Sequence, residues 1–189
     1  MTIRIRLILL VALALAQMGV PGALIYRHES VLHEGKAFKF RVAPVDPYDA
    51  FRGRFVALAF ERTDAPAPPE LSGRRGRAWA RITGGPDGFA QFEEVTARKP
   101  VSGDFVEVRL TYVYQGRAHF RLPFDRFYME ESAAPEAEQA LWRRTPGQVG
   151  RRMVYVVVRI LDGQAVTEQL FLDGVPIAQY LRENSPARF

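Results

Sequence analysis

The apolar residues near the N-terminus form a continuous run with no polar face. Residues Leu7–Ile25 include no charged side chain, while Arg4 and Arg6 precede the run and Arg27 follows it. A helix of this length would extend about 28 Å, close to the ~30 Å hydrocarbon core of a bilayer. The pattern therefore predicts an N-terminal transmembrane helix.

Residues 1–28 have two interpretations. In the first they are a permanent signal-anchor of a single-pass protein in the cytoplasmic (inner) membrane. In the second they contain a secretory signal peptide that is cleaved after Ala16, at a small-x-small sequence that begins with Ala14. Apolar character resumes after Ala16 and continues to Ile25, which favours the anchor. Positive charge crowds the short N-terminal side, so both interpretations place residues 29–189 in the periplasm or at the cell exterior.

Beyond the leader, apolar positions begin to alternate with polar ones, as in strands with one buried face. The segment Lys36–Val42 alternates with Phe40 on its inward face. Phe105–Tyr114 is the clearest alternating segment, and its period places Tyr112 and Tyr114 on the core face. Further strands are predicted at Phe55–Phe60, Ala78–Thr83, Phe89–Val95, Ala118–Leu122, Val154–Leu161 and Val166–Leu172.

Turn residues and two short helical segments complete the pattern. Strong hairpin signals occur at Asp162-Gly163 and Asp173-Gly174, and Ala65–Pro69 is predicted as a loop. Helices are predicted at Pro135–Arg144 and Ile177–Arg182. Roughly seven to nine short strands with one or two short helices indicate a mainly β domain, either a sandwich or a partly open barrel, after the N-terminal transmembrane helix.

Composition narrows the classes of function. Hydrophobic residues make up 48% of the 189-residue chain, which is enough for the core of one domain after the leader is set aside. The chain has no cysteine, so disulfides, thiol catalysis and cysteine metal sites are excluded. The net charge of +5 suits anionic lipid headgroups, whereas the predicted compartment argues against nucleic acid.

The residue spacing contains no recognised motif of catalysis, metal binding or cofactor binding. The histidines His28, His33 and His119 are not spaced as a set of metal ligands. The sequence lacks the serine elbow, the HExxH pair and the GxGxxG loop. We therefore assign no catalytic residue, no metal ligand and no cofactor, and we favour a non-enzymatic role.

One segment carries a family resemblance. Gly53 and Leu58 match two positions of a Gly-Asp-Tyr-x-x-Leu-x-Tyr motif, and Phe55 and Phe60 stand at its two tyrosine positions. Arg54 stands at the aspartate position, which reverses the charge. The turn that precedes the motif contains Pro44, Asp46 and Pro47. On these residues the chain resembles the GDYXXLXY family of bacterial membrane-anchored proteins.

The resemblance implies an N-terminal apolar segment, a motif strand, a helix past the middle and late Asp-Gly hairpins. It brings no established biochemical activity. The residues themselves suggest two roles for the motif strand: a core strand with a special entry turn at Gly53, or a binding element. Loss of both tyrosine hydroxyls favours packing, because polar groups are what orient a ligand.

Three hypotheses of function remain open. The leading one is a membrane-anchored envelope protein whose β-rich domain binds a partner, an integral membrane protein of the same envelope, with any small-molecule ligand unassigned. The second is an envelope polymer hydrolase or lyase that gathers loop carboxylates, for which the candidates are Asp46, Asp125, Glu130 and Glu131. The third is a structural or anionic-lipid-contact protein that uses the arginines of 74–77, 143–144 and 151–152.

Overall fold

The computed structural model describes residues 3–43, 55–130, 133, 136–137, 140–141 and 152–184. This part of the chain is mainly β, as the alternating pattern predicts. Its helices are α1 (Ile3–Glu34), the short 3₁₀ helix η2 (Pro69–Leu71) and α3 (Ile177–Asn184). Its strands are β1 (Lys36–Ala43), β2 (Phe55–Ala57), β3 (Ala59–Phe60), β4 (Asp64–Pro66), β5 (Gly76–Gly84), β6 (Ala90–Thr96), β7 (Phe105–Tyr114), β8 (Arg117–Arg121), β9 (Arg126–Tyr128), β10 (Val154–Leu161), β11 (Gln164–Leu172) and β12 (Val175–Pro176).

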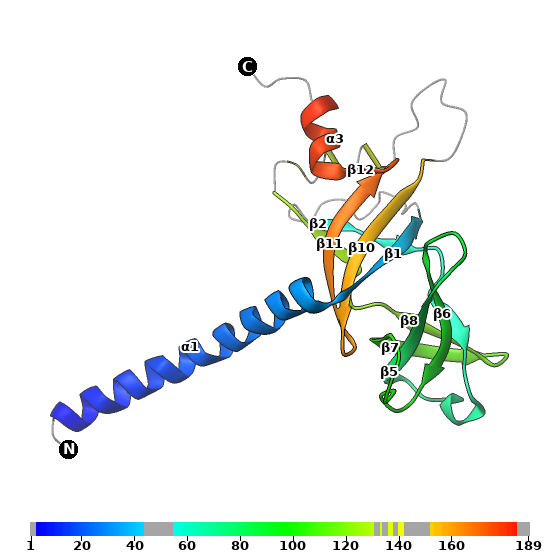
Figure 1. The fold of residues 1–189 in the computed structure, drawn as a ribbon. Helices are drawn as coiled ribbons and strands as arrows, with labels where there is room; N and C mark the ends of the chain where they lie inside the picture. The colour runs from blue at the N-terminus through cyan, green and yellow to red at the C-terminus, as the bar shows by residue number, and fades with distance from the viewer. Residues whose placement is uncertain are drawn as a thin grey trace.

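Two five-stranded antiparallel sheets form most of the domain. The first sheet has the order β12-β11-β10-β1-β3 and the second has the order β4-β8-β7-β5-β6, while β2 and β9 form a separate pair. One hydrophobic cluster takes buried side chains from both sheets, including Phe40 and Val156 from the first and Val108 from the second. The β10–β11 turn reaches β7, where the N–H of Glu107 donates to the carbonyl of Gly163 at 2.9 Å. The sheets therefore curve around one core in a barrel-like, nearly closed arrangement (Figure 1).

The hairpin β10–β11 follows directly from its local sequence. Asp162 and Gly163 have φ values of +51° and +86° in the turn between the two strands. Asp173 and Gly174 repeat this geometry before β12, with φ values of +51° and +85°. Two-residue hairpin turns of this kind need positive φ at both positions, which Asp-Gly supplies at low cost. Both turn predictions and the predicted strand Val154–Leu161 are confirmed.

Strand β7 has the predicted bounds, but its last residues face the other way. The register between β7 and β8 shifts just before Tyr112, so that Thr111 is an extra residue. The hydroxyl of Thr111 donates to the carbonyl of His119 at 2.7 Å within this bulge. A bulge interrupts the alternation of faces, so Val113 packs toward the core while Tyr112 and Tyr114 are exposed. The prediction that both tyrosines lie on the core face is therefore wrong.

The predicted strand Phe55–Phe60 is divided in two. β2 pairs with β9, whereas β3 pairs with β1, so the chain passes from one sheet to another at Leu58. Leu58 is nevertheless buried, and its N–H donates to the carbonyl of Asp125 at 2.9 Å. An apolar run predicts burial on both sides but carries no signal for a change of partner strand.

The shorter elements agree with the sequence pattern in part. Ala65–Pro69, predicted as a loop, contains the end of β4, an edge strand that pairs with β8 and tolerates Pro66 at this position. Of the predicted helix Pro135–Arg144, residues 136, 137, 140 and 141 are helical, and the others lie outside the described residues. The predicted terminal helix is confirmed as α3, which ends at Asn184.

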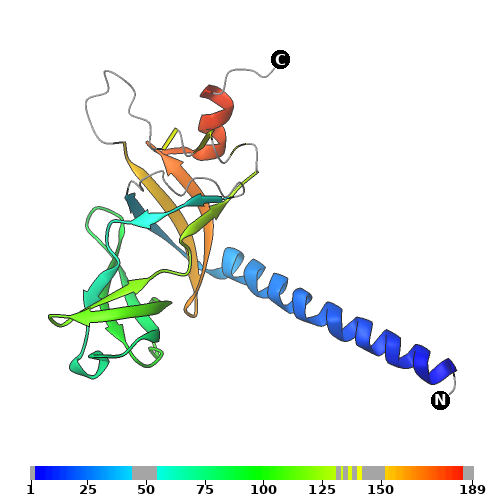
Figure 2. The ribbon, with the colours of Figure 1, turned by 180° about the vertical axis from the view of Figure 1, so that it is seen from behind.

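The N-terminal helix α1 projects away from the sheets (Figures 1 and 2). It continues through Pro21 and ends at Glu34. Near this end Val31 is buried, and the N–H of Gly35 donates to the carbonyl of Val31 at 3.0 Å. Across the described residues, no helix combines the length and the apolar character needed to cross a membrane.

Gly35 fixes the junction between α1 and β1. A Cβ at this position would collide with the carbonyl oxygen of Val31 and would lie 3.1 Å from the backbone nitrogen of Ile160, so only glycine fits without a shift. The guanidinium of Arg159 donates to the carbonyl of Gly35 at 3.2 Å and to both carboxylate oxygens of Glu168 at 2.7 and 3.0 Å. The Glu168 carboxylate holds the pKa of Arg159 above its ordinary value. The hydrogen bond to the Gly35 carbonyl and the ion pair with Glu168 together fix the direction in which α1 leaves the domain.

Candidate functional site

The motif residues that the structure describes lie in three different surroundings. Phe55 lies on β2, where its ring centre is 5.8 Å from that of Tyr128 and 4.8 Å from the guanidinium carbon of Arg126. Leu58 is buried at the break between β2 and β3. Phe60 lies on β3 and packs against the core. The other predicted motif and turn positions, Gly53, Pro44, Asp46 and Pro47, lie outside the described residues.

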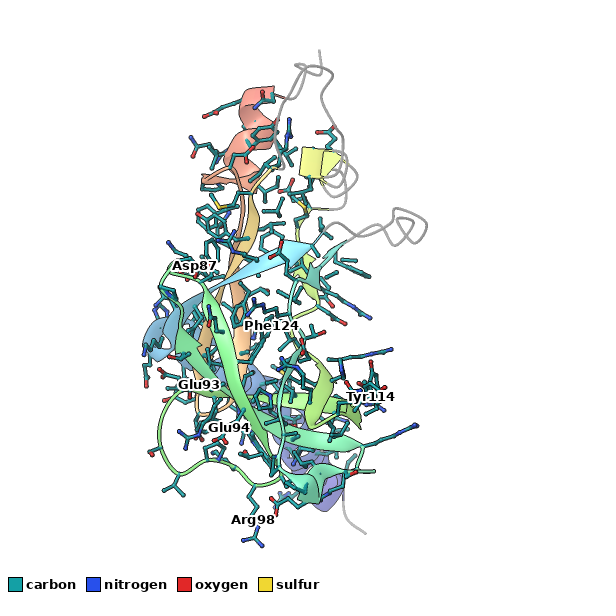
Figure 3. The ribbon with its side chains drawn as sticks, turned by 90° about the vertical axis from the view of Figure 1, so that its right-hand side faces the viewer. Asp87, Glu93, Glu94, Arg98, Tyr114 and Phe124 are labelled. Atoms are coloured by element: carbon teal, nitrogen blue, oxygen red, sulfur yellow. The ribbon has the colours of Figure 1, made fainter. Side chains whose placement is uncertain are left out.

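Phe60 belongs to an aromatic cluster at the centre of the domain. Its ring lies edge-on to Phe40 at 6.1 Å and to Phe124 at 5.3 Å. Phe40 also lies 5.1 Å from Phe124 and stacks on Phe92 at 5.7 Å, and Phe92 meets Phe120 edge-on at 5.0 Å. Such pairs add about 0.5–1.5 kcal/mol each beyond the burial of their area. Figure 3 shows Phe124 in the interior, between the strands, where it joins the motif strand to the core.

A hollow of about 130 Å³ lies at the edge of this cluster. Phe40, Phe60 and Phe92 line its apolar side, and Arg41 and Asp87 are among the residues on its polar side. Pockets for drug-sized ligands have volumes of about 300–1,000 Å³. The hollow therefore suits one inserted side chain or a small group rather than a complete metabolite.

An ion pair lies on the polar side of the hollow. Arg41 Nη2 donates to Asp87 Oδ2 at 3.2 Å, and the Arg41 guanidinium carbon lies 3.9 Å from the ring centre of Phe89. Phe89 meets Tyr155 edge-on at 5.7 Å, and Tyr155 stacks on Phe171 at 4.8 Å. These contacts attach the β5–β6 loop, with Asp87 at its tip (Figure 3), to the outer face of the first sheet.

The Asp87 carboxylate is predicted to stabilise this loop in its ionised form. The N–H of Phe89 donates to Asp87 Oδ1 at 3.2 Å and, with Arg41, holds the pKa of Asp87 below its ordinary value of 3.8. A carboxyl with a lowered folded-state pKa contributes stability above its unfolded pKa and loses it as pH falls through the folded value. We expect Asp87→Asn to lower the urea midpoint at pH 7, with the difference from wild type shrinking below about pH 4.

The control for this effect is Glu93→Gln, which removes an exposed carboxylate on β6. We expect it to leave the urea midpoint at pH 7 nearly unchanged. A difference between Asp87→Asn and wild type that stays constant from pH 7 to pH 3 would contradict the charge-dependent contact.

Of the described carboxylates of the hydrolase hypothesis, Asp125 does not line the hollow that Glu130 lines. Asp125 is exposed, and its Oδ1 lies 3.8 Å from Nε of Arg126. Glu130 lines a different hollow, of about 510 Å³, together with Glu136 and Arg182. Asp46 and Glu131 lie outside the described residues.

The histidines and arginines of the sequence hypotheses are dispersed. His28 and His33 lie on α1 and His119 lies on β8, and the described residues include no group of three His, Asp or Glu side chains that could hold a metal. Arg77 pairs with Glu107 at 2.8 Å, and Arg152 donates to the carbonyl of Ala140 at 2.7 Å. Arg74 and Arg75 are exposed before β5, whereas Arg143, Arg144 and Arg151 lie outside the described residues.

Sequence reasoning did not predict Arg41, Asp87 or Phe89 as site residues. The alternation of β1 places Arg41 on the polar face, and the Gly-Pro-Asp-Gly sequence marks Asp87 as a turn residue. Neither signal indicates that the two side chains meet, because they come from distant parts of the chain.

The comparisons with known proteins agree with the resemblance of the motif. The family model described as GDYXXLXY protein matches residues 17–170, which include the motif strand and nearly all strands of both sheets. No curated protein and no solved structure matches the chain. The matched range covers well over half of the sequence, so the chain belongs to the GDYXXLXY protein family.

Proposed function

We propose that this protein is a membrane-anchored binding module. In this proposal α1 is held in the cytoplasmic membrane and presents the β domain on the exterior side, where the domain binds another membrane protein of the same envelope. The third sequence hypothesis, contact with anionic lipid, is compatible with the same placement.

The observation that carries the proposal is the exposure of the apolar side chains of α1 that the structure describes. Every residue from 16 to 29 is exposed in the structure, and Met18, Leu24 and Tyr26 are 72%, 61% and 74% exposed. Apolar area left in water forgoes about 25 cal/mol per Å² of favourable transfer free energy. A helix with exposed apolar side chains on every side requires an apolar environment that the β domain does not supply.

The charges next to the apolar run support an orientation. Arg4 and Arg6 precede the run, whereas Glu29 and Glu34 accompany Arg27 after it. Basic residues in short flanking segments are retained in the cytoplasm. This arrangement supports an exterior β domain.

The junction at Gly35 supports a presenting role for α1. The Arg159 guanidinium and the buried Val31 connect the end of the helix with β10 and the β10–β11 hairpin. A domain attached in this way keeps one orientation relative to the helix, whereas a long flexible linker would let it rotate. One face of the domain is then presented consistently to a neighbouring membrane protein.

The anchor is tested with Leu13→Arg in the full chain. A charge at the centre of a membrane helix weakens insertion by about 2.5–3.5 kcal/mol. We expect wild type to float with membrane vesicles in a density gradient after alkaline washing, and the ratio of floating to soluble protein to fall at least tenfold in the variant. Leu13→Val is the matched control, and it is expected to float like wild type.

Two results would contradict the anchor, and a third would contradict the binding role. Wild type that remains at the bottom of the gradient, or a mature protein that begins at Gln17, would exclude a permanent anchor. For the binding role, purification of the full chain in mild detergent is expected to enrich one integral membrane protein, and recovery of background alone would count against a partner.

A further inference from the structure

The outer face of the second sheet carries a row of arginines. In the register of the sheet, Arg77 on β5 lies opposite Arg109 on β7, and Arg109 lies opposite Arg121 on β8. All three side chains are exposed, because neighbours such as Val108 and Phe120 take the inward positions. Like charges that are directly opposite in neighbouring strands destabilise a sheet. Packing alone therefore gives no reason for this row.

Among the described residues, a carboxylate compensates the row at one end, where Glu107 pairs with Arg77. Arg77 Nε lies 2.8 Å from Glu107 Oε1, and both side chains are exposed. Within the part of the chain that the structure describes, Arg109 and Arg121 form no ion pair and no side-chain hydrogen bond. Two neighbouring guanidinium groups thus face solvent with their donors available to an external anion.

The β-bulge brings aromatic side chains to the same face. Because of the extra residue Thr111, Tyr112 and Tyr114 point outward and are 51% and 63% exposed. Tyr112 stacks on His119 of β8 with ring centres 4.4 Å apart. Trp79 is the next outward position after Arg77 on β5 and is half-buried. Bulges commonly redirect side chains beside functional sites.

We propose that this arginine–aromatic face, formed by Arg77, Trp79, Arg109, Tyr112, Tyr114 and Arg121, binds an acidic segment of a protein partner. The inference rests on the proposed function, because it assigns the surface through which the anchored module binds. It goes beyond the motif strand, since none of these residues belongs to the motif.

The residue types of the face match a protein partner with carboxylate side chains. Tryptophan, tyrosine and arginine dominate the energetically important positions of protein interfaces. Strands β5, β7 and β8 contain no lysine, and arginine is the residue that binds planar carboxylates through two parallel hydrogen bonds. Arg159, which donates to both carboxylate oxygens of Glu168, shows the same chemistry within the domain.

The position of the face disfavours the bilayer as its main contact. In Figures 1 and 2 the β7–β8 hairpin projects to the side of the domain opposite α1. If α1 lies in the membrane, the tip of this hairpin, with Tyr114 close to it, points away from the lipid surface. A protein that extends outward from the same membrane can reach it.

The test measures binding of two fluorescent peptides to the purified full chain in mild detergent, by anisotropy at low salt. One peptide alternates glutamate with serine and the other alternates glutamate with tyrosine. We expect both to bind, the second more tightly, and Arg109→Gln combined with Arg121→Gln to weaken both at least tenfold. Tyr112→Ala combined with Tyr114→Ala is expected to remove the preference for the second peptide.

The matched control combines Arg98→Gln with Arg182→Gln, which removes the same charge from a loop and from α3. We expect it to change binding less than twofold. An equal loss in this control, or no binding of either peptide by wild type, would overturn the proposal. Binding of phosphatidylglycerol vesicles or polyphosphate without binding of either peptide would also overturn it, because phosphate would then be the ligand chemistry.

The variants are expected to leave the core intact, and thermal unfolding is the measurement that checks this. Removing one or two charges from a like-charged row is expected to leave the unfolding temperature unchanged or to raise it slightly.

Failure of the proposal is distinguishable from failure of the proposed function. A chain that does not float with membranes can still bind the peptides, and a chain that does not bind the peptides can still be anchored.

Discussion

Phe40→Ala is expected to cost about 3–5 kcal/mol of the free energy of unfolding. The Phe40 side chain is 3% exposed, and its ring contacts those of Phe60, Phe92 and Phe124. Truncation removes all three contacts and leaves a cavity that neighbouring strands of two sheets can close only in part. Typical domains are stable by about 5–15 kcal/mol, so a loss of this size removes a large fraction of the total.

The measurement is urea unfolding of the full chain in mild detergent, followed by tryptophan fluorescence. If the urea midpoint falls while the slope of the unfolding free energy against urea concentration stays the same, the variant has lost stability and its unfolded state has not changed. Phe40→Leu retains most of the volume and is expected to cost less than half as much. Phe55→Ala, which truncates a partly exposed ring of the β2–β9 pair, is the second control. A Phe40→Ala midpoint close to wild type would show that the cluster does not hold the two sheets together.

The parts of the fold that sequence predicts are those determined by neighbouring residues. The alternation within 36–42 and the uninterrupted apolar run of Val154–Leu161 are local patterns, and β1 and β10 form at those positions. The Asp-Gly turns are also local, because positive φ at both positions is a property of the two residues themselves. Each of these predictions needs no knowledge of which strand lies beside which.

The parts that sequence does not predict depend on partners from elsewhere in the chain. The bulge at Thr111 exists in the pairing with β8, so the alternation of β7 alone places Tyr112 on the wrong face. The motif strand is divided at Leu58 because its first part pairs with β9 and its second part pairs with β1. The ion pair of Arg41 with Asp87 requires the β5–β6 loop to meet the first sheet.

Of the residues that line the hollow, the sequence motif predicts Phe60 alone. Phe60 was identified through the motif, and the structure places it among other rings of the core. A tyrosine hydroxyl at a buried site requires a hydrogen-bond partner, whereas phenylalanine requires none. The phenylalanine at this position therefore fits a packing role within the cluster, whereas the polar residues of the hollow, which include Arg41 and Asp87, lie at its other edge.

Leu58→Ala distinguishes packing from binding for the motif itself. Leu58 is 5% exposed at the break between β2 and β3, and truncation of such a buried leucine is expected to cost about 2–5 kcal/mol in the free energy of unfolding. Leu58→Met keeps the volume and should cost less than about 1.5 kcal/mol, so urea unfolding separates the two variants. The opposite result is a Leu58→Ala protein that keeps the stability of wild type but no longer enriches a membrane partner. That result would assign the motif a direct role in binding, because the β2–β3 break would then belong to an interface and not to the core.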